Sequence, residues 1–299
     1  MSSTESGRCG LVAIVGRPNV GKSTLLNALV GEKISIVTDK PHTTRQRILG
    51  VLNRGADQAV FIDTPGYAHR TKRALHRLMA RAIHQAVQDC DVALLVVEAT
   101  GLRSQDHALV EMLEGKLDRT LLVLNKIDAM GSKSELLPTL QKMADYPFAA
   151  LIPVSAKSGD NLERLSQLIF EYLPQAPALF PRDMSTDRDL VFRIAEVIRE
   201  KLMMLVHQEV PYGLTVEVEY LGHNEEGQRL IHGLIWLERE SQKRIVIGKE
   251  GHVLKQAGSA ARIELRELLG ERVHLELWVK VREHWADSER ELQRLGLDI

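Results

Sequence analysis

Eight consecutive residues near the amino terminus, Gly16 to Ser23, read Gly-Arg-Pro-Asn-Val-Gly-Lys-Ser and fit the pattern of a phosphate-binding loop. They lie between an aliphatic run, Leu11 to Val15, and an expected helix, Thr24 to Val30, which is the context that the pattern requires. In such a loop backbone N–H groups point at a di- or triphosphate, Lys22 neutralises its charge, and the Ser23 hydroxyl can bind Mg²⁺. The residues expected to contact the nucleotide here are Gly16, Arg17, Pro18, Asn19, Val20, Gly21, Lys22, Ser23 and Thr24.

A second group of residues follows the aliphatic run Ala59 to Ile62. The sequence Asp63-Thr64-Pro65-Gly66 places the Asp63 carboxylate near the metal and the Gly66 N–H near a γ-phosphate. The bare pattern is weak, because Asp128 to Gly131 fits it as well. The preceding strand is the reason to include Asp63, Thr64, Pro65 and Gly66 in the nucleotide site.

Two loops further along the chain point to a guanine base. Asn125-Lys126-Ile127-Asp128 follows the run Thr120 to Leu124, and the Asp128 carboxylate can accept from both N1–H and the exocyclic amine of guanine. Adenine lacks that pair of donors, so such a site rejects it. In the second loop, backbone N–H groups of Ser155, Ala156 and Lys157 could meet the guanine carbonyl. Each loop alone also fits an ordinary polar connection.

The elements that must hold these loops alternate between aliphatic runs and helical stretches from Leu11 to Tyr172. This alternation indicates an α/β domain with a mostly parallel sheet. The segment Arg54-Gly55-Ala56 joins two runs as a hairpin, which predicts one antiparallel edge strand. The expected strands are residues 11–15, 48–52, 59–62, 92–97, 120–124 and 151–154.

A stretch that contains three prolines, Pro174 to Asp187, marks a domain boundary. Beyond it the pattern predicts a smaller α+β domain with helices at 190–205 and 257–269 and strands at 214–220, 231–238 and 273–281. We therefore expect a polar tail at residues 1–8, a first domain at 9–173, a linker at 174–188 and a second domain at 189–299.

Composition and charge restrict the class of protein. The 299 residues include 39 Lys and Arg against 40 Asp and Glu, so any contact with nucleic acid must be local. Cys9 and Cys90 form no metal or redox motif, which fits a reducing compartment. The amino terminus lacks the pattern of a secretory signal, and no apolar run approaches the roughly 20 residues that span a bilayer. We expect a cytoplasmic protein that is at most peripheral on the inner membrane.

The order of the four loops, each after a strand, resembles a translation-factor-type GTPase domain. The phosphate loop, then Thr43-Thr44-Arg45, then Asp-Thr-Pro-Gly, resembles the Era and EngA branch. The chain has one phosphate loop, unlike EngA, and no cysteine after Cys90, unlike MnmE, so the Era family is the best match. This resemblance implies hydrolysis of GTP to GDP and phosphate with Mg²⁺.

The resemblance also implies how the metal is bound. It places a first switch between Val30 and Gln46, in which Thr44, in preference to Thr43, senses the γ-phosphate. The metal ligands expected on this basis are Ser23, Thr44 and Asp63.

The hydrolytic machinery departs from that of many GTPases. Tyr67 follows Gly66, where a water-orienting glutamine is common, so hydrolysis is expected to be slow or to use another device. In similar proteins the asparagine that corresponds to Asn19 helps hold a potassium ion beside the phosphates. A simple loop cap is the alternative for this residue. The residues expected to take part in hydrolysis are Asn19, Lys22, Thr44 and Gly66.

In the second domain, Gly248-Lys249-Glu250-Gly251 fits GxxG, although Gly7 to Gly10 fits it as well. The order helix, strand, strand, short helix, GxxG, helix, strand resembles a type II KH domain, whose turn contacts about four single-stranded nucleotides. Around the turn basic residues outnumber acidic ones, although the whole region is acidic. The residues expected to contact RNA are Arg244, Ile247, Gly248, Lys249, Glu250, Gly251 and Lys255.

Resemblance to the Era family implies the 3′ end region of 16S ribosomal RNA as the ligand and assembly of the small ribosomal subunit as the process. We expect a monomer and no DNA partner. The alternative is a nucleotide-controlled adaptor whose second domain binds a protein or membrane partner. A basic stretch after the second switch is either a solvated face or a docking site for RNA or an anionic membrane; its residues are Arg70, Lys72, Arg73, Arg77 and Arg81.

Overall fold

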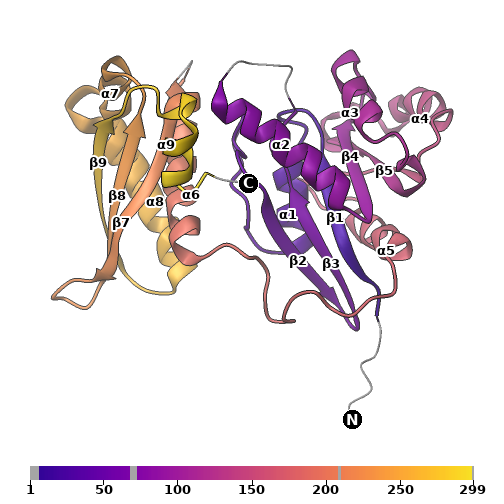
Figure 1. Ribbon diagram of the computed structural model, residues 1–299, viewed down its shortest axis with the longest axis horizontal. Helices are drawn as coiled ribbons and strands as arrows, with labels where there is room; N and C mark the ends of the chain where they lie inside the picture. Colours follow the sequence, from indigo (N-terminus) through magenta and orange to yellow (C-terminus); the bar gives the residue numbers. More distant parts are fainter. Residues whose placement is uncertain (1–6, 68–72, 208–209, 298–299) are drawn as a thin grey trace, which may run out of the picture.

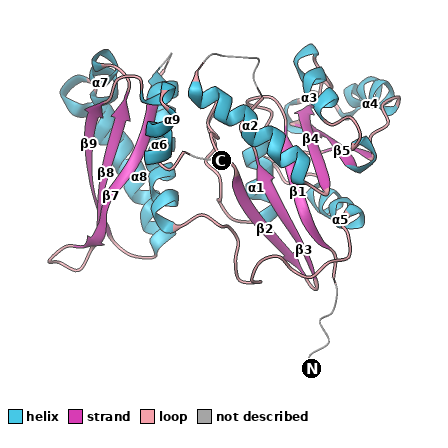
Figure 2. Ribbon diagram, in the orientation of Figure 1, coloured by secondary structure: helices cyan, strands magenta, loops and turns pink. Residues whose placement is uncertain are grey.

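The computed structural model describes residues 7–67, 73–207 and 210–297 of the chain. Its elements form two β-sheets, each covered by helices, with the carboxyl-terminal sheet and its helices on the left in Figure 1. Figure 2 shows the strands of each sheet beside these helices. Arg70 and Lys72 lie outside the described residues.

The amino-terminal sheet has six strands in the order β2-β3-β1-β4-β5-β6. Only β2 is antiparallel to its neighbour, β3, and the other pairs are parallel. This confirms the predicted sheet with one antiparallel edge strand. The strands are β1 (Cys9–Val15), β2 (Ile48–Arg54), β3 (Asp57–Asp63), β4 (Val92–Glu98), β5 (Thr120–Asn125) and β6 (Ala150–Pro153).

This sheet is buried on both faces, because its strands are aliphatic throughout. In β1, Val12 and Ile14 face the core beneath α1 and α5, whereas Ala13 and Val15 face the core beneath α2, α3 and α4. The helices are α1 (Lys22–Val30), α2 (Ala74–Asp89), α3 (His107–Met112), α4 (Leu136–Ala144) and α5 (Leu162–Tyr172).

The carboxyl-terminal sheet has three strands, with β8 antiparallel to β7 and parallel to β9. Helices α6 and α8 share one aliphatic core with it, and α7 leads from β8 to the GxxG turn. The predicted element order of this region is therefore confirmed. Its elements are α6 (Leu190–Leu205), β7 (Leu214–His223), β8 (Arg229–Leu237), α7 (Glu240–Ile247), α8 (His252–Leu269) and β9 (Val273–Val281).

Several boundaries differ from the sequence expectation. Helix α8 begins at His252 rather than Ala257, and its first turn already places Val253 and Leu254 against the core of this unit. A short 3₁₀ turn, Trp285–Asp287, and helix α9 (Glu289–Arg294) were not predicted. Trp285 is fully buried there among Ala74, Leu75 and Met79 of α2. Among the helices that the structure describes, none is long and apolar enough to span a membrane.

The connection between the two sheets follows the edge strand β2 and then leads to α6 (Figure 1). The Val51 N–H donates to the carbonyl of Ser185 at 2.8 Å, and the Thr186 hydroxyl donates to the carbonyl of Leu49 at 2.7 Å. Gln58 Oε1 accepts the N–H groups of Leu179 and Phe180. The segment is therefore bound along its length, and it covers the polar edge that β2 would otherwise expose.

Candidate functional site

The phosphate loop and parts of the other predicted loops line a cleft of about 480 Å³ at the carboxyl ends of the parallel strands. Its walls are the phosphate loop, the first-switch segments 36–40 and 42–44, Gly66 and Lys126. The volume is in the range of a cofactor pocket. Helix α1 begins at Lys22, directly after the loop, so its amino-terminal N–H groups lie at the cleft.

Lys22 is the buried cation of this cleft. Its Nζ donates to the carbonyl of Arg17 at 2.9 Å, and its residue is 6% exposed. Burial lowers the pKa of Lys22 to about 8, although the nearby Asp63 carboxylate opposes the shift. A phosphate group placed here would supply the negative charge that favours the ammonium form.

Ser23, Asp63 and Thr44 come together as the sequence analysis expects of a metal site. The Ser23 hydroxyl donates to Asp63 Oδ2 at 2.7 Å and lies 2.9 Å from Thr44 Oγ1. A fourth residue, Ser35, donates to the same Asp63 oxygen at 3.0 Å. Sequence reasoning missed Ser35, because it lies in an aperiodic segment without a motif.

This donor set fits Mg²⁺. Asp63 is fully buried, and its Oδ1 has no hydrogen-bond partner among the described residues. Burial raises the pKa of Asp63. A bound cation would lower this pKa again, because a nearby positive charge favours the carboxylate. The residues that the structure describes contain no group of three or more His, Cys, Asp or Glu suited to a metal. Mg²⁺ keeps water and substrate phosphates as most of its ligands. A site with a small number of protein ligands, all of them oxygen atoms, matches this preference.

The two adjacent threonines have different surroundings. Thr43 Oγ1 donates to the carbonyl of Lys40 at 2.7 Å and lies 2.6 Å from Thr38 Oγ1, within the switch segment itself. Thr44 Oγ1 faces Ser23 and Asp63. Thr44 Oγ1, and not Thr43 Oγ1, therefore lies beside the oxygens of Ser23 and Asp63.

Gly66 lies directly against the phosphate loop. A Cβ at this position would lie 2.7 Å from both the N and the Cα of Pro18, so only glycine allows this approach. The next N–H, of Tyr67, donates to the carbonyl of Gly16 at 3.1 Å. The turn is thereby fixed at the cleft, where a γ-phosphate would lie.

The two guanine loops are bonded to each other. Asn125 Nδ2 donates to the carbonyl of Val20, and its Oδ1 accepts the N–H of Ala156 at 3.0 Å. The Ser155 hydroxyl donates to Asp128 Oδ1 at 2.6 Å. Asn125 thus links both loops to the phosphate loop, and the hydroxyl of Ser155 orients the carboxylate that would read the base.

Some predicted contact residues direct their side chains elsewhere. Arg17 binds Asp106 at 2.7 Å, and the Thr64 hydroxyl donates to the carbonyl of Ile14. Lys126 pairs with Glu98 at the end of β4, although it also lines the cleft. The polar ends of these side chains form bonds that support the loops. Only the backbone atoms and the aliphatic parts of these residues are left to contact a nucleotide. Lys157 is exposed.

His42 is a residue of the cleft that sequence reasoning missed. Its ring lies 5.0 Å from that of His76 and 5.7 Å from that of Tyr212. Its Nδ1 is buried and has no hydrogen-bond partner within the described part of the chain. Burial, with the neighbouring His76, lowers the pKa of His42 to about 4.

The first switch is also hydrogen-bonded to the carboxyl-terminal unit, which is the three-stranded sheet together with its helices. Arg199 of α6 donates to the carbonyl of Thr43 at 2.6 Å, and Glu200 Oε1 accepts the N–H of Val37 at 2.9 Å. In the other direction, Arg45 donates to the carbonyls of Pro211 and Leu214. Arg45, Arg199 and Glu200 are at most 3% exposed. No local pattern marks these contacts, which join residues more than 150 positions apart.

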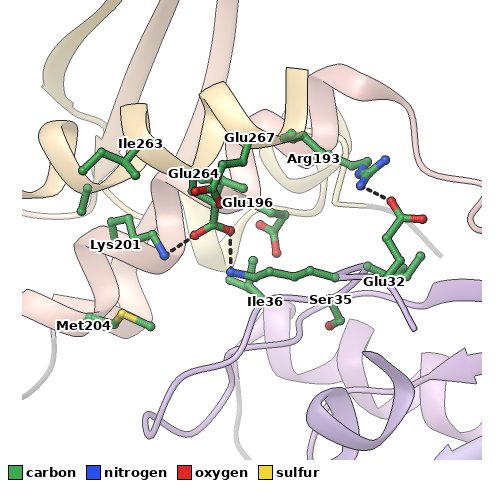
Figure 3. Close-up of a pocket in the computed structure, with 15 residues that line it drawn as sticks. Glu32, Ser35, Ile36, Arg193, Glu196, Lys201, Met204, Ile263, Glu264 and Glu267 are labelled. Atoms are coloured by element: carbon green, nitrogen blue, oxygen red, sulfur yellow. Dashed lines mark hydrogen bonds and ion pairs between the residues drawn. The ribbon is translucent and has the colours of Figure 1, made fainter. Parts of the chain in front are cut away.

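Ion pairs surround a second cavity, of about 790 Å³, between residues 32–36 and helices α6 and α8. In Figure 3, Arg193 points toward Glu32 and Lys201 toward Glu264. Lys33 binds both Glu200 and Glu264 at 2.6 Å. Through Glu32 and Lys33, these ion pairs join the beginning of the first switch to α6 and α8.

Three arginines, one directly before α2 and two within it, are bonded to the carboxyl-terminal unit as well. Arg73 pairs with Glu238 and Asp287, and Arg77 and Arg81 pair with Glu289. These three residues therefore contribute to an intramolecular contact, which supports neither of the two alternatives, a solvated face or a docking site for RNA or a membrane.

The GxxG turn lies between α7 and α8. Gly248 has φ 74° and ψ 175°, and a Cβ there would lie 2.6 Å from Val253 Cγ2, so the position requires glycine. Gly251 is the N-cap of α8, and no atom would lie within 4 Å of an added Cβ. The exposed side chains around the turn include Arg244, Lys249, Glu250 and Lys255, and Ile247 is half-buried.

Comparison with known proteins extends these observations. Residues 11–126 match the family model described as 50S ribosome-binding GTPase, and residues 209–286 match the KH domain. The proteins named GTPase Era from Yersinia enterocolitica and Yersinia pestis are each 45% identical over 297 residues, covering 99% of this chain and 98% of theirs.

Two solved structures share the whole fold. An Aquifex aeolicus Era variant bound to GDP·AlF₄⁻ superposes with a TM-score of 0.94 at 39% identity, covering 98% of this chain and 100% of that one. Era in complex with MgGDPNP and nucleotides 1506–1542 of 16S ribosomal RNA gives the same TM-score, identity and coverage.

Proposed function

The chain belongs to the Era family of GTPases, and from this premise we propose that it binds the 3′ end region of 16S ribosomal RNA through its KH domain. We propose further that it acts in assembly of the small ribosomal subunit. Full-length similarity to an Era that was solved with this RNA and MgGDPNP supports the ligand. The oxygen cluster at Asp63 supports Mg²⁺, which would neutralise charge on the phosphates.

The observation that carries this proposal is the open turn at the start of α8. The amino end of a helix attracts a phosphate, and nothing lies within 4 Å of an added Cβ at Gly251. Lys249 and Lys255 are exposed beside it. The backbone of a single strand can therefore approach the helix end and its neighbouring cations.

A pair of variants at Gly251 tests this surface. Gly251→Asp places a carboxylate where the RNA phosphate should lie, while Gly251→Asn has the same shape without the charge. Both residues tolerate a left-handed conformation and cap helices, so the fold should survive both. We expect Asp to weaken binding of a synthetic 16S 3′ end RNA about tenfold more than Asn, in a titration at fixed salt.

GTP affinity of both variants serves as the control for the G domain and should match the wild type. If the Asp and Asn variants bind RNA equally well and as tightly as the wild type, the turn is not the RNA site. The adaptor function, with a protein or membrane partner, would then be favoured. Crosslinking and sequencing of RNA bound in cells would separate the two functions independently.

The contacts between the first switch and α6 support a nucleotide-dependent switch. We propose that GTP, through Thr44 and its neighbours, sets the position of the KH domain and so the RNA affinity. Arg199 and Glu200 bind the backbone on either side of residues 38–42, which gives a change in this segment a direct route to α6. Both ligands would then act on one two-state element, which is the requirement for coupling.

Potassium is the other ion that we propose for this site. Asn19 Nδ2 donates to the carbonyl of Asp39 at 2.8 Å, so the phosphate loop and the first switch meet at the position that the family resemblance gives to K⁺.

We also propose domain bounds of 9–173 and 189–299, a cytoplasmic site of action, and a monomer. Peripheral contact with a membrane has no support from Arg73, Arg77 and Arg81, which are paired within the chain.

A further inference from the structure

The unexplained group in the nucleotide cleft is the imidazole of His42. GTP hydrolysis needs a group that orients the attacking water, and Tyr67 stands where many GTPases have a glutamine. His42 lines the nucleotide cleft together with Lys22, Thr44 and Gly66. It is thus a polar side chain at the γ-phosphate end of the site to which neither the family features nor the metal cluster gives a role.

His42 also lines a second, smaller space. A cavity of about 30 Å³ lies among His42, Gly66, Tyr67 and His76. The lining also includes Met79, Ala80 and Ile83. A water molecule needs about 10–15 Å³ of such space. His42 therefore lines both the nucleotide cleft and a space large enough for one water.

Two aromatic rings pack around the imidazole. His76 and Tyr212 contact its faces and edge, and Nδ1 is left without a partner among the described residues. A buried nitrogen without a partner costs free energy unless a ligand or water completes it. Nδ1 is thus a buried polar atom without a partner in the described part of the chain, in a residue that lines the nucleotide cleft.

We propose that His42 is a catalytic residue of this GTPase whose ring nitrogen accepts a hydrogen bond from the attacking water. The water oxygen bonds to the γ-phosphorus, and the bond to the β–γ bridging oxygen breaks with its electron pair left on GDP. One water proton passes to a γ-phosphate oxygen, and the imidazole keeps its own protonation state. The role rests on GTP hydrolysis by this chain and adds the group that orients the water.

The backbone of His42 suggests the variants that test this role. Its φ of 60° is a left-handed conformation, which glycine adopts freely and asparagine tolerates. His42→Gly therefore removes the imidazole without backbone strain. His42→Asn keeps an amide oxygen near the position of Nδ1. His84→Asn, at an exposed position on α2, is the matched control.

The measurement is the single-turnover rate of GTP hydrolysis, with GTP and GDP affinity measured separately. We expect His42→Gly to hydrolyse GTP at least about tenfold more slowly, which corresponds to the loss of one hydrogen bond in the transition state. Its nucleotide affinity should be unchanged. His42→Asn should recover part of the rate, and added imidazole should accelerate His42→Gly but not the wild type or His84→Asn.

A wild-type rate in His42→Gly would overturn the proposal. So would a slow rate that neither asparagine nor imidazole restores, because a side chain with a merely structural role is not replaced by a small base in solution. Hydrolysis by the wild type is measured first. Failure of that step would contradict the assigned GTPase reaction, and not the role of His42.

Discussion

At the scale of single residues, the nucleotide site depends on side chains that each form hydrogen bonds with two other residues. Asn125 bonds both the phosphate loop and the second guanine loop, and Asp63 accepts from Ser23 and Ser35. The motif residues could be named from the sequence, because each motif follows a strand. Ser35 and His42 could not, because their roles come from where an aperiodic segment folds back over the cleft.

The potassium proposal makes a prediction at this scale. If Asn19 helps hold K⁺, replacing K⁺ by Na⁺ at constant ionic strength should slow hydrolysis about tenfold or more, since one transition-state contact is worth about that factor. Asn19→Gly removes the amide, and its φ of 64° is one that glycine adopts freely. In this variant we expect the rate of GTP hydrolysis in K⁺ to fall to the rate in Na⁺.

GTP affinity in both salts is the control for binding. Equal turnover of the wild type in K⁺ and Na⁺ would remove potassium from the mechanism.

At the scale of elements, strands and long helices follow from the sequence, but their partners do not. The aliphatic runs predicted all six strands of the first sheet, with ends that moved by a few residues. Helix α9 is too short for a periodic signal, and burial of Trp285 against α2 depends on contacts between residues about 210 positions apart. The contacts of Arg45 and Arg199 are likewise set by how the two units meet.

Helix α6 therefore makes a prediction of its own. Arg199 donates to the carbonyl of Thr43 and pairs with Glu196. Changing both, Arg199→Met with Glu196→Gln, removes the contact and leaves no carboxylate unpaired. We expect RNA to lose its effect on the affinity for a GTP analogue, which in the wild type should be about fivefold or more.

Calorimetric titration of the analogue, with and without RNA, measures this effect. The control is the exposed pair on α5, changed in the same way as Arg164→Met with Glu171→Gln. A full RNA effect in the α6 variant would show that the switch reaches the KH domain by another route.

At the scale of the whole molecule, the carboxyl-terminal unit contacts both the first switch and the helix that follows the second switch. The first switch binds α6 through Arg199 and Glu200, and α2, which follows the second switch, packs against Trp285 and pairs with Glu289. The segment 174–188 stays on the edge of the first sheet. On the proposed function, a change at the γ-phosphate would bear on both contacts, while the segment 174–188 keeps the two units attached.

The most direct test of this account is the affinity of the wild-type protein for the 16S 3′ end RNA, measured at one salt concentration with GDP and with a non-hydrolysable GTP analogue. The account predicts that RNA binds about fivefold or more tightly in the GTP form, because a typical coupling free energy gives at least that ratio. Identical affinities in the two nucleotide states would contradict it.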